Sequence, residues 1–593
     1  MKRTALLLIC LVLCLGASVW AEEEPGGFTY TVSMAGEAEI TGYTGADTEL
    51  VIPAVLDGHT VVSVGADAFK GNKTLTSVVL SEGITSIGNG AFYGCTKLSS
   101  VTVPGTLVSI GAEAFSGCTA LPSVSLPYGV TEIGPKAFMS CSKLAFFSIP
   151  ATVTEIAEGT FSNCKNLSYV IIPESVRSIG ESAFSHCEKL TSPTLPRSVT
   201  NIGAYAFDSC RMPFIILPEG VAELGDDACA NNSVLSSVSL PASLVTVGAN
   251  PFCGCTSLET ITVASGNPVL RVTDGVLMSS DDRRLIYYPL QLTKNQYAVP
   301  DGIRIIGKDA FFSSEHLSAV TLPESVIEIR DNSFNRCKNL RTLILPNCIT
   351  YIGNGAFYLC SSLVSVTIPG NVISIGNGAF YNCSNLTSVT ISDGVTSIGD
   401  NAFENCKQLG YVSIPNSIAF IGNRAFSGCR SLRSVNIPNN VTFIGEYAFS
   451  GCALTSVVIP NSVSSINEGS FSNCRLESIT ISDSVTTIGK HAFSCCNYLT
   501  SVTIPNSVTT ISDGAFISCP YLSSVTIPDS VTTIGEFAFS TCKRLTRITV
   551  PDSVTAIGKE AFSGCSDRLV LTVRRGSYAE QYAIDNSLGY KIA

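Results

Sequence analysis

The chain has 593 residues, of which 45% are hydrophobic and only 14% are charged, and its formal net charge is −11. This acidic balance argues against a nucleic-acid or anionic-membrane partner, because both call for basic patches. The apolar residues are spread periodically, and no apolar run of about 20 residues follows the N-terminal region, so we expect no transmembrane anchor.

Residues 1–21 have the features of a secretory signal peptide. A basic start is followed by the apolar run Ala5–Leu15 and by small residues ending at Ala21. A buried helix is one alternative. A lipoprotein signal at Cys10 or Cys14 is another, and it is disfavoured because each of these cysteines follows a bulky residue. The leader predicts a protein that is secreted or held at the cell surface.

Residues 22–59 alternate apolar and polar positions outside any repeat register. We expect them to form an N-terminal β cap, because an open end of a stacked-coil protein would expose unpaired strand edges.

From residue 60 onward a 23-residue unit recurs, and its Phe position marks the period. That position is held by Phe69, Phe92, Phe115, Phe138, Phe161, Phe184, Phe207, Cys229 and Phe252, and after a gap by Phe311, Phe334, Phe357, Phe380, Phe403, Phe426, Phe449, Phe471, Phe493, Phe516, Phe539 and Phe562.

The unit is written most clearly in Ser501–Phe539, where S-V-T-I-P-x-S-V-T-T-I-x-x-x-A-F-x-x-C occurs twice. The segment L-x-x-V-x-I-P predicts a short strand ended by Pro, which cannot donate a sheet hydrogen bond. V-T-x-I-G predicts a second short strand followed by a bend. F-x-x-C-x-x-L has helical or 3₁₀ spacing. No coil can bury its apolar face alone, so we expect a β-rich solenoid of about 21 stacked coils.

The pattern L-x-x-V-x-I-P-x-S-V-T-x-I-G-x-x-A-F-x-x-C resembles the BspA-type leucine-rich repeat. The resemblance covers about nine tenths of the chain after the leader. It implies a leucine-rich repeat solenoid in a secreted or surface protein that adheres to host matrix proteins or to other microbes, with no catalytic residues. The predicted arrays are residues 60–255 and 302–568.

Residues 256–301 interrupt the repeat. Two apolar runs around Ser279–Asp282 predict a β-hairpin. It either packs on the flank of the solenoid or forms a binding loop, because insertions in solenoids often lie on one functional face. Tyr287 and Tyr288 are the candidate binding residues of such a loop.

Residues 569–593 break the pattern again and are expected to form a C-terminal cap. The stretch 577–586 has helical composition, and Tyr578, Tyr582 and Ile584 are predicted to lie on one side. No sorting motif follows, so we expect no covalent wall anchor.

Eighteen of the 24 cysteines occupy the F-x-x-C position. Equivalent side chains in stacked coils point the same way about 4.8 Å apart, whereas a disulfide needs Cβ atoms turned toward each other. We therefore expect buried free thiols rather than disulfides, and no metal site, since a single file cannot converge tetrahedrally. Outside that position lie Cys229, Cys253, Cys348 and Cys495, which are expected to be the exposed cysteines.

No catalytic or phosphate-binding pattern is present in the sequence, so we expect neither an enzyme nor a cofactor. His186 beside Cys187 is the one candidate dyad, and we disfavour it because a cysteine in the repeat position should be buried and inert.

Function is therefore sought on the surface. The outward strand positions are mostly Ser and Thr, but a few coils carry large apolar residues instead. Stacking should align five of them into an exposed strip interrupted by Ser192 and Thr194, while the second array adds two more. The strip residues are Phe146, Tyr169, Ile171, Phe214 and Ile216, and the residues of the second array are Ile344 and Tyr411. Exposed apolar patches often mark interaction sites; the alternative is a set of scattered surface hydrophobes.

The sequence thus predicts a secreted or surface binding protein of an adhesin type, monomeric, whose partner is an extracellular or cell-surface protein such as a host matrix protein. Two alternatives stay open: a structural component of the cell envelope without a discrete ligand, and a glycan-binding module built on Ser, Thr and Asn rows with occasional Tyr.

Overall fold

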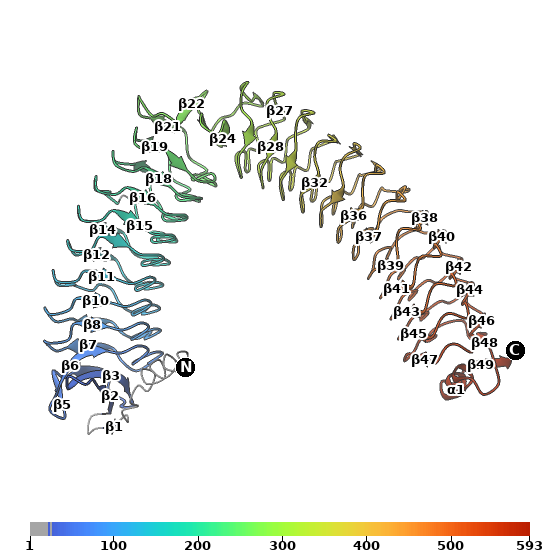
Figure 1. Ribbon diagram of the computed structural model, residues 1–593, viewed down its shortest axis with the longest axis horizontal. Coiled ribbons are helices and arrows are strands. Elements are labelled where there is room, and N and C mark those ends of the chain that lie inside the picture. The colour runs from blue at the N-terminus through green and yellow to red at the C-terminus, as the bar shows by residue number, and fades with distance from the viewer. Residues whose placement is uncertain (1–21, 24–26, 192) are drawn as a thin grey trace, which may run out of the picture. The chain divides into compact units, whose positions relative to one another are not determined.

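The computed structural model describes residues 22–23, 27–191 and 193–593, which form two compact units, one ending at Val272 and one spanning Thr273–Ala593 (Figure 1). We call them unit 1 and unit 2. The predicted signal peptide, residues 1–21, lies outside the described residues. Both units are β-solenoids with a period of about 23 residues, and together they make about 24 turns rather than the expected 21.

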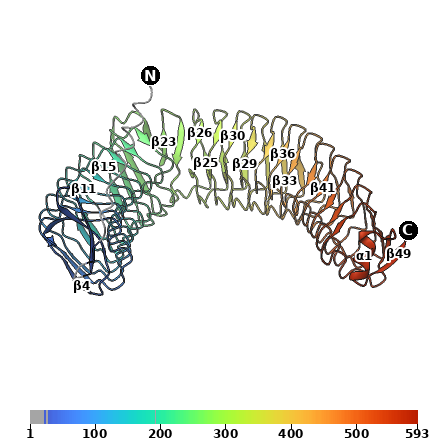
Figure 2. The ribbon, with the colours of Figure 1, turned by 60° about the horizontal axis from the view of Figure 1, so that its bottom comes forward.

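Most coils contribute one long strand and one short strand to two separate parallel sheets; in the coils around residues 124, 193 and 435 no long strand is assigned. In unit 2, Val502 of one coil pairs with Val525 of the next in the long-strand sheet, and Ile511 pairs with Ile534 in the short-strand sheet. Each pair is one repeat apart, so identical residues stack on one another. Figure 2 shows the short strands β30 and β36 above the long strands β29 and β33.

In unit 1 the long strands are β4 (Glu49–Ile52), β7 (Ser77–Leu80), β9 (Ser100–Thr102), β12 (Phe146–Ser148), β14 (Tyr169–Ile171), β17 (Phe214–Ile216), β19 (Ser237–Leu240) and β21 (Thr260–Val263). The short strands are β6 (His59–Val64), β8 (Ser86–Ile87), β10 (Ser109–Ile110), β11 (Glu132–Ile133), β13 (Glu155–Ile156), β15 (Ser178–Ile179), β16 (Asn201–Ile202), β18 (Glu223–Leu224) and β20 (Thr246–Val247). The other strands are β1 (Glu22–Glu23), β2 (Phe28–Val32), β3 (Glu37–Tyr43), β5 (Val55–Leu56) and β22 (Leu270–Thr273).

In unit 2 the long strands are β25 (Gln296–Ala298), β27 (Ala319–Thr321), β29 (Thr342–Ile344), β31 (Ser365–Ile368), β33 (Ser388–Ile391), β35 (Tyr411–Ser413), β38 (Ser456–Val458), β40 (Ser478–Thr480), β42 (Ser501–Thr503), β44 (Ser524–Thr526), β46 (Arg547–Thr549) and β48 (Val570–Val573). The short strands are β26 (Ile305–Ile306), β28 (Glu328–Ile329), β30 (Tyr351–Ile352), β32 (Ser374–Ile375), β34 (Ser397–Ile398), β36 (Phe420–Ile421), β37 (Phe443–Ile444), β39 (Ser465–Ile466), β41 (Thr487–Ile488), β43 (Thr510–Ile511), β45 (Thr533–Ile534) and β47 (Ala556–Ile557). The remaining elements are β23 (Val276–Ser279), β24 (Arg284–Tyr287), α1 (Tyr578–Asp585) and β49 (Gly589–Ile592).

The Phe of each coil lies in a turn that makes a third column of hydrogen bonds between coils. The Phe92 N–H, for example, donates to the Ala114 carbonyl at 2.7 Å. Gly90 and Gly94, two residues before and two after Phe92, have φ of 62° and 67°. Left-handed residues on both sides stop the turn from continuing as a helix. The expected 3₁₀ or helical segments are therefore isolated turns, and within the described part of the chain α1 is the one helix.

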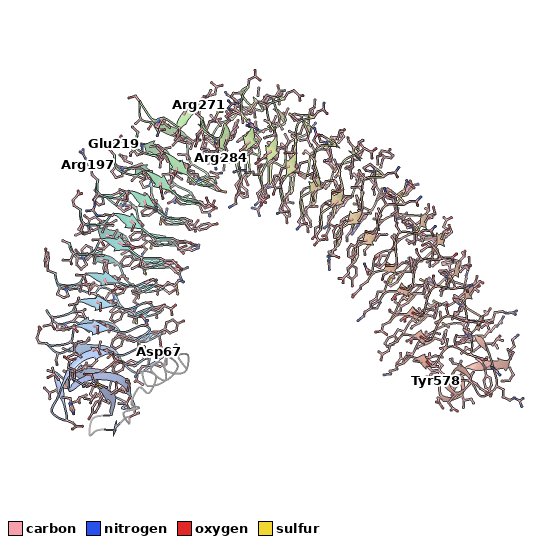
Figure 3. All side chains as sticks on the ribbon, viewed as in Figure 1. Asp67, Arg197, Glu219, Arg271, Arg284 and Tyr578 are labelled. Atoms are coloured by element: carbon pink, nitrogen blue, oxygen red, sulfur yellow. The ribbon has the colours of Figure 1, made fainter. Side chains whose placement is uncertain are left out.

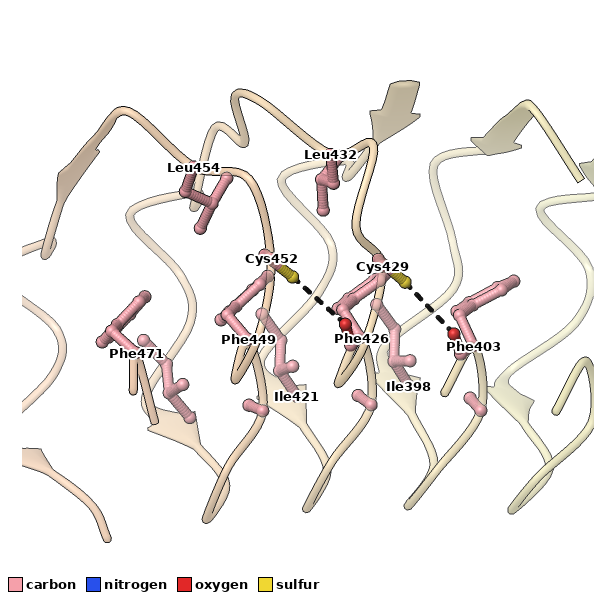
Figure 4. Packing of buried hydrophobic residues seen from close by; sticks show 14 of the residues in the cluster. Ile398, Phe403, Ile421, Phe426, Cys429, Leu432, Phe449, Cys452, Leu454 and Phe471 are labelled. Atoms are coloured by element: carbon pink, nitrogen blue, oxygen red, sulfur yellow. Dashed lines mark hydrogen bonds between the residues drawn. The ribbon is translucent and has the colours of Figure 1, made fainter. Parts of the chain in front are cut away.

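The core is a set of stacked columns. Phe403, Phe426 and Phe449 lie in line, with ring centroids 5.3 Å apart at each step and interplanar angles of 8°. Ile398 and Ile421 of the short strands form a second buried column beside them (Figure 4). Burial of such side chains, about 1.5–3 kcal/mol each, is the main stabilising contribution. A coil obtains it only from its neighbours.

The N-terminal cap is shorter than the predicted segment 22–59. β1, β2 and β3 pair antiparallel, as a cap should. However, Ile40 of β3 already pairs in parallel with Val64, and Leu50 of β4 with Val78. The solenoid thus begins near residue 37. The sequence hides this start because these first coils lack the repeat signature.

The predicted insertion 256–301 is mostly ordinary solenoid, which corrects its boundaries. β21 pairs in parallel with β19, and at the other end the N–H of Tyr288 donates to the Ala310 carbonyl at 2.9 Å, the bond that Phe makes in other coils. Tyr288 therefore occupies the Phe position one period before Phe311. The predicted hairpin exists but is confined to β23 and β24, in which Leu277 pairs with Tyr287.

The C-terminal cap contains the expected helix, α1, but with a different buried face. Ser577 caps it by accepting from the Glu580 N–H at 3.2 Å. Tyr582 is buried, whereas Tyr578 and Ile584 are about half exposed. The reason is that the Tyr582 hydroxyl must reach the Ala561 N–H, at 3.1 Å, to close the end of the solenoid.

Candidate binding surface on the long strands

Most long strands bury a central residue and turn its two flanking residues outward; in β9 and β40 the central residue is half-buried. In β42 the outward residues are Ser501 and Thr503, on either side of buried Val502. We call the outward positions the first and second outer positions. Because neighbouring coils are in register, each outer position forms a row along the sheet.

β12 and β14 carry large apolar residues in these rows. Phe146 pairs with Tyr169 in the first row, and Ser148 pairs with Ile171 in the second. The rings of Phe146 and Tyr169 stack with centroids 6.0 Å apart and an interplanar angle of 16°. They remain 43% and 53% exposed, and Ile171 is exposed beside them. The structure thus brings these three predicted residues together on one surface.

The next coil is different. Ser192, predicted in the first row, lies outside the described residues, and Thr194 in the second row is exposed. The residue between the two rows is Pro193, and no strand is assigned over 193–195. Pro lacks the N–H that a parallel strand must donate, which explains the break.

One coil further, β17 presents Phe214 and Ile216, both exposed. These two residues pair with Ser237 and Ser239 of β19, so they form an apolar ridge beside small polar neighbours. We use the name apolar strip for Phe146, Tyr169, Ile171, Phe214 and Ile216. The strip has two clusters separated by the Pro193 coil, and the sequence predicted an interruption at this coil.

The remaining predicted surface residues stand apart. Tyr411 of β35 pairs with Ser388, and Ile344 of β29 pairs with Thr321. Both are strongly exposed. Each is an apolar residue next to a small polar partner and extends no apolar row.

Tyr287 and Tyr288 do not form an exposed binding loop, which corrects that prediction. They are 2% and 1% exposed. Tyr288 packs edge-on against Tyr297 with centroids 5.1 Å apart, and burial raises the pKa of Tyr288 to about 12. They belong to the core because the chain reaches the Phe position at Tyr288.

The short-strand sheet carries an exposed aromatic pair that the analysis of long-strand rows missed. Phe420 of β36 and Phe443 of β37 stack at 4.8 Å with an angle of 4°, and both are more than one-third exposed. The signal was present in the sequence, because the residue before the conserved Ile of the short strand is Phe only in these two coils.

The cysteines of the F-x-x-C position form a column along the solenoid, and each thiol donates a hydrogen bond to a backbone carbonyl. Cys429 donates to the Phe403 carbonyl at 3.2 Å, and Cys452 donates to Phe426 at 3.2 Å (Figure 4). The same bond recurs along both units, and no two cysteines of the described residues form a disulfide. Burial raises the pKa of Cys406 to about 12. The structure therefore confirms a buried column of free thiols.

The cysteines outside that column are less exposed than predicted. Cys229 is buried, because it holds the Phe position of its coil and its carbonyl accepts from Cys255 at 3.2 Å. Cys253, Cys348 and Cys495 are half-buried.

His186 and Cys187 do not form a dyad. Cys187 donates its thiol to the Phe161 carbonyl at 3.2 Å, and burial raises its pKa to about 12. The His186 ring instead lies 3.7 Å from the Asp208 carboxylate and is largely exposed. A thiol held in this way is a poor nucleophile.

Fold and surface together define a leucine-rich-repeat-like β-solenoid whose variable residues lie on its outer rows. The chain belongs to the family described as the BspA type leucine rich repeat region, which matches residues 55–168, 155–272, 287–410, 398–475 and 443–568. The matched ranges leave out 273–286, which contains β23 and the hairpin loop. The chain is thus a BspA-type repeat protein, and membership of this family is consistent with a location at the cell surface.

Among solved structures, the chain is similar to a leucine-rich repeat protein from Eubacterium ventriosum, with 20% identity, a TM-score of 0.42, and coverage of 74% of this chain and 96% of that one. It is also similar to a leucine rich cell surface protein from Faecalibacterium prausnitzii, with 25% identity, a TM-score of 0.33, and coverage of 86% and 94%. No curated protein sequence matches the chain. Within the described residues, no helix has the length and apolar character needed to cross a membrane.

Proposed function

We propose that this chain is a secreted or cell-surface binding protein that engages an extracellular protein partner, in the manner of an adhesin, through the apolar strip of unit 1. The observation that carries the proposal is the exposed stack of Phe146 on Tyr169 with Ile171 beside it. Other coils place Ser or Thr in these outer positions without loss of the fold, as β42 and β44 do. The large residues are therefore not needed by the solenoid.

Aromatic residues are the usual anchors of protein interfaces, and exposed apolar patches on soluble proteins often serve binding. The family and the predicted leader support a location outside the cytoplasm. Thiols that are buried and protonated, and a His186 ring that lies beside Asp208 rather than beside a thiol, support a binding role rather than catalysis. Matrix proteins and cell-surface proteins are the partner class proposed, with the chain acting as a monomer.

The test uses the chain from Glu22 onward against a panel of purified matrix proteins and intact host cells. Saturable binding is expected. The triple variant Phe146→Ser, Tyr169→Ser, Phe214→Ser should weaken it at least tenfold without changing the melting temperature. Tyr128→Ser is the matched control, because Tyr128 is also an exposed aromatic residue but lies in a turn rather than on a long strand.

Unchanged binding by the triple variant would show that the apolar strip does not bind the partner. Binding to a glycan array but not to protein would favour the glycan-binding alternative. Concentration-dependent self-assembly without a saturable partner would favour a structural envelope component.

A further inference from the structure

The Pro193 coil of unit 1 contains an apolar pocket of about 420 Å³. Its walls come from two neighbouring coils. Leu195 is on one side, Met212 and Ile215 are on the other, and Phe207 of the core Phe column also lines it. Phe207 and Met212 are each 2% exposed, so the pocket reaches residues that are otherwise sealed in the core.

Two departures from the repeat coincide at this pocket. Pro193 occupies the buried strand position held by Val170 in the coil before and Ile215 in the coil after. Pro is shorter than these residues and cannot join the sheet, and it is only half-buried here. Leu195, two residues further on, is half-buried too. The coil of Met212 is also one residue short between Cys210 and the following strand, because Phe207 to Cys229 is a step of 22.

Polar groups are few and lie at the rim. Thr194 and Arg197 line the pocket, and both are exposed. Glu174 and Glu219 hold the same repeat position as Arg197 in the adjacent coils, but the Glu219 carboxylate accepts from the Ala242 N–H at 3.2 Å in the following coil. Figure 3 labels Arg197 and Glu219 at the left edge of the view, on neighbouring coils. Within the described part of the chain, no carboxylate lies within ion-pair distance of the Arg197 guanidinium.

We propose that this pocket, which we call the Pro193 pocket, binds a small amphiphile. An aromatic or short acyl body enters against Phe207, Met212 and Ile215, and an anionic group is held by Arg197. The volume lies within the range of about 300–1,000 Å³ typical of small-ligand sites, and such sites are mostly apolar with a few orienting polar groups. The proposal does not depend on the protein partner proposed above, although Phe214 and Ile216 belong to both surfaces.

In a regular coil the residues equivalent to Pro193 and Leu195 are more deeply buried. Where the repeat is intact, as at Val502 in β42, the central residue is buried and the Ile that follows, Ile504, is 2% exposed. The pocket therefore arises where the side chains of the Pro193 coil meet those of the coil that follows it.

The experiment compares two fluorescent probes that differ by one sulfonate: 1-anilinonaphthalene-8-sulfonate and the uncharged N-phenyl-1-naphthylamine. Both should bind the natively folded chain saturably, with one site per chain. Arg197→Gln should weaken the sulfonate probe at least fivefold and leave the uncharged probe within twofold. Leu195→Trp should fill the pocket and weaken both at least tenfold.

Two further variants keep the test decisive. Thr194→Tyr places bulk at the exposed mouth, where the fold does not depend on the residue, so it should weaken both probes even where Leu195→Trp fails to fold. Val458→Ser is the matched control, because Val458 is exposed in the second outer position of β38, as Ile216 is in β17. It should leave both probes unchanged.

Absence of saturable binding, or loss of binding in Val458→Ser, would overturn the proposal. So would probe binding that survives both Leu195→Trp and Thr194→Tyr. If neither probe binds but Leu195→Trp abolishes capture of a matrix protein, the pocket receives a partner's side chain instead, and the amphiphile is ruled out. Probe binding without any protein partner would leave the pocket proposal standing and remove only the proposed adhesin function.

Discussion

β12 and β14 in unit 1 and β42 and β44 in unit 2 are the same structure with different surfaces. In each pair the strands run parallel and stack residues that are one period apart. Phe147 and Val170 are buried in one pair as Val502 is in the other. Outward, the first pair presents a stacked Phe and Tyr, whereas the second presents two Ser residues.

This comparison indicates that the inward residues determine the backbone of a coil, which leaves the residues of the outer rows free to vary. At Pro193 the inward residue also changes, and in that coil no long strand is assigned and a pocket opens. The following experiments test this separation between inward and outward positions, in order of decreasing change in stability.

Alkaline pH should destabilise both units strongly, whatever their outer rows carry. Burial raises the pKa of Cys95 to about 11 and of Cys141 and Cys337 to about 12. An unfolded thiol loses its proton near its ordinary pKa of about 8.5–9, while the folded thiol keeps it. The folded state then binds more protons, so stability falls as pH rises from about 9 toward 12, by about 1.4 kcal/mol per pH unit for each titrating thiol.

Urea unfolding midpoints at pH 7, 9, 10 and 10.5 measure this effect. The control is a variant with the half-buried Cys253, Cys348 and Cys495 changed to Ser, which should show the same decline. Equal midpoints at pH 7 and 10.5 would contradict a buried, protonated thiol column.

Phe403→Ala should destabilise unit 2 by about 3–5 kcal/mol, because it empties a fully buried position in the Phe column. Phe403 stacks on Phe380 at 5.2 Å and on Phe426 at 5.3 Å, so the loss acts on three coils. Denaturant unfolding gives the magnitude, and amide exchange should show protection lost first in these coils. The outward change Ser501→Ala is the control and should stay within about 0.5 kcal/mol. A Phe403→Ala effect below about 1 kcal/mol would contradict the stacked-column account.

Ser314→Cys should stabilise unit 2 by about 1 kcal/mol. Ser314 holds the repeat position that Cys337 holds one coil later. There the Cys337 thiol donates to the Phe311 carbonyl at 3.0 Å. The buried Ser314 hydroxyl has no hydrogen-bond partner among the described residues. A Cys restores the repeat bond and removes an unsatisfied buried group, whose cost is about 1–3 kcal/mol. Thermal unfolding measures the change, with Ser313→Cys as a neighbouring control. A lower melting temperature for Ser314→Cys would be the contrary result.

Transplanting the aromatic stack should change stability least. Ser501→Phe with Ser524→Tyr recreates on β42 and β44 the pair that β12 and β14 carry. We expect the free energy of unfolding to change by less than about 1 kcal/mol, because cross-strand aromatic pairs at exposed positions contribute roughly 0.2–1 kcal/mol. A double-mutant cycle isolates the pair term. A loss above about 2 kcal/mol would show that the outer rows are not free to vary.

The sequence predicts the columns well, because each inward position recurs with the same chemistry. It predicts exceptions less well. Tyr288 was missed because it is not Phe and because it lies 36 residues after Phe252, although it is one period before Phe311 and makes the same backbone bond. Cys229 was expected to be exposed because it lies outside the F-x-x-C position, although it holds the Phe position of its coil. In both cases the stacking neighbours decide burial, and the residue itself does not.

The candidate surface divides in the same way. The exposure of Phe146, Tyr169 and Phe214 follows from strand alternation alone. The Pro193 pocket does not, because it depends on how Leu195 and Met212 settle around a missing strand. Which face of α1 is buried likewise depends on the last coil, because the Ala561 N–H at its end donates to the Tyr582 hydroxyl.

The three shortened coils show where the chain tolerates a change of length. Each lacks one residue in the turn after its Cys, as in Cys452–Leu454 and Cys474–Leu476, while Phe449, Phe471 and Phe493 still stack. Cutting or adding a whole period at this turn would keep every column continuous. The reach of such a protein can therefore be tuned by gene duplication or loss independently of what its outer rows bind.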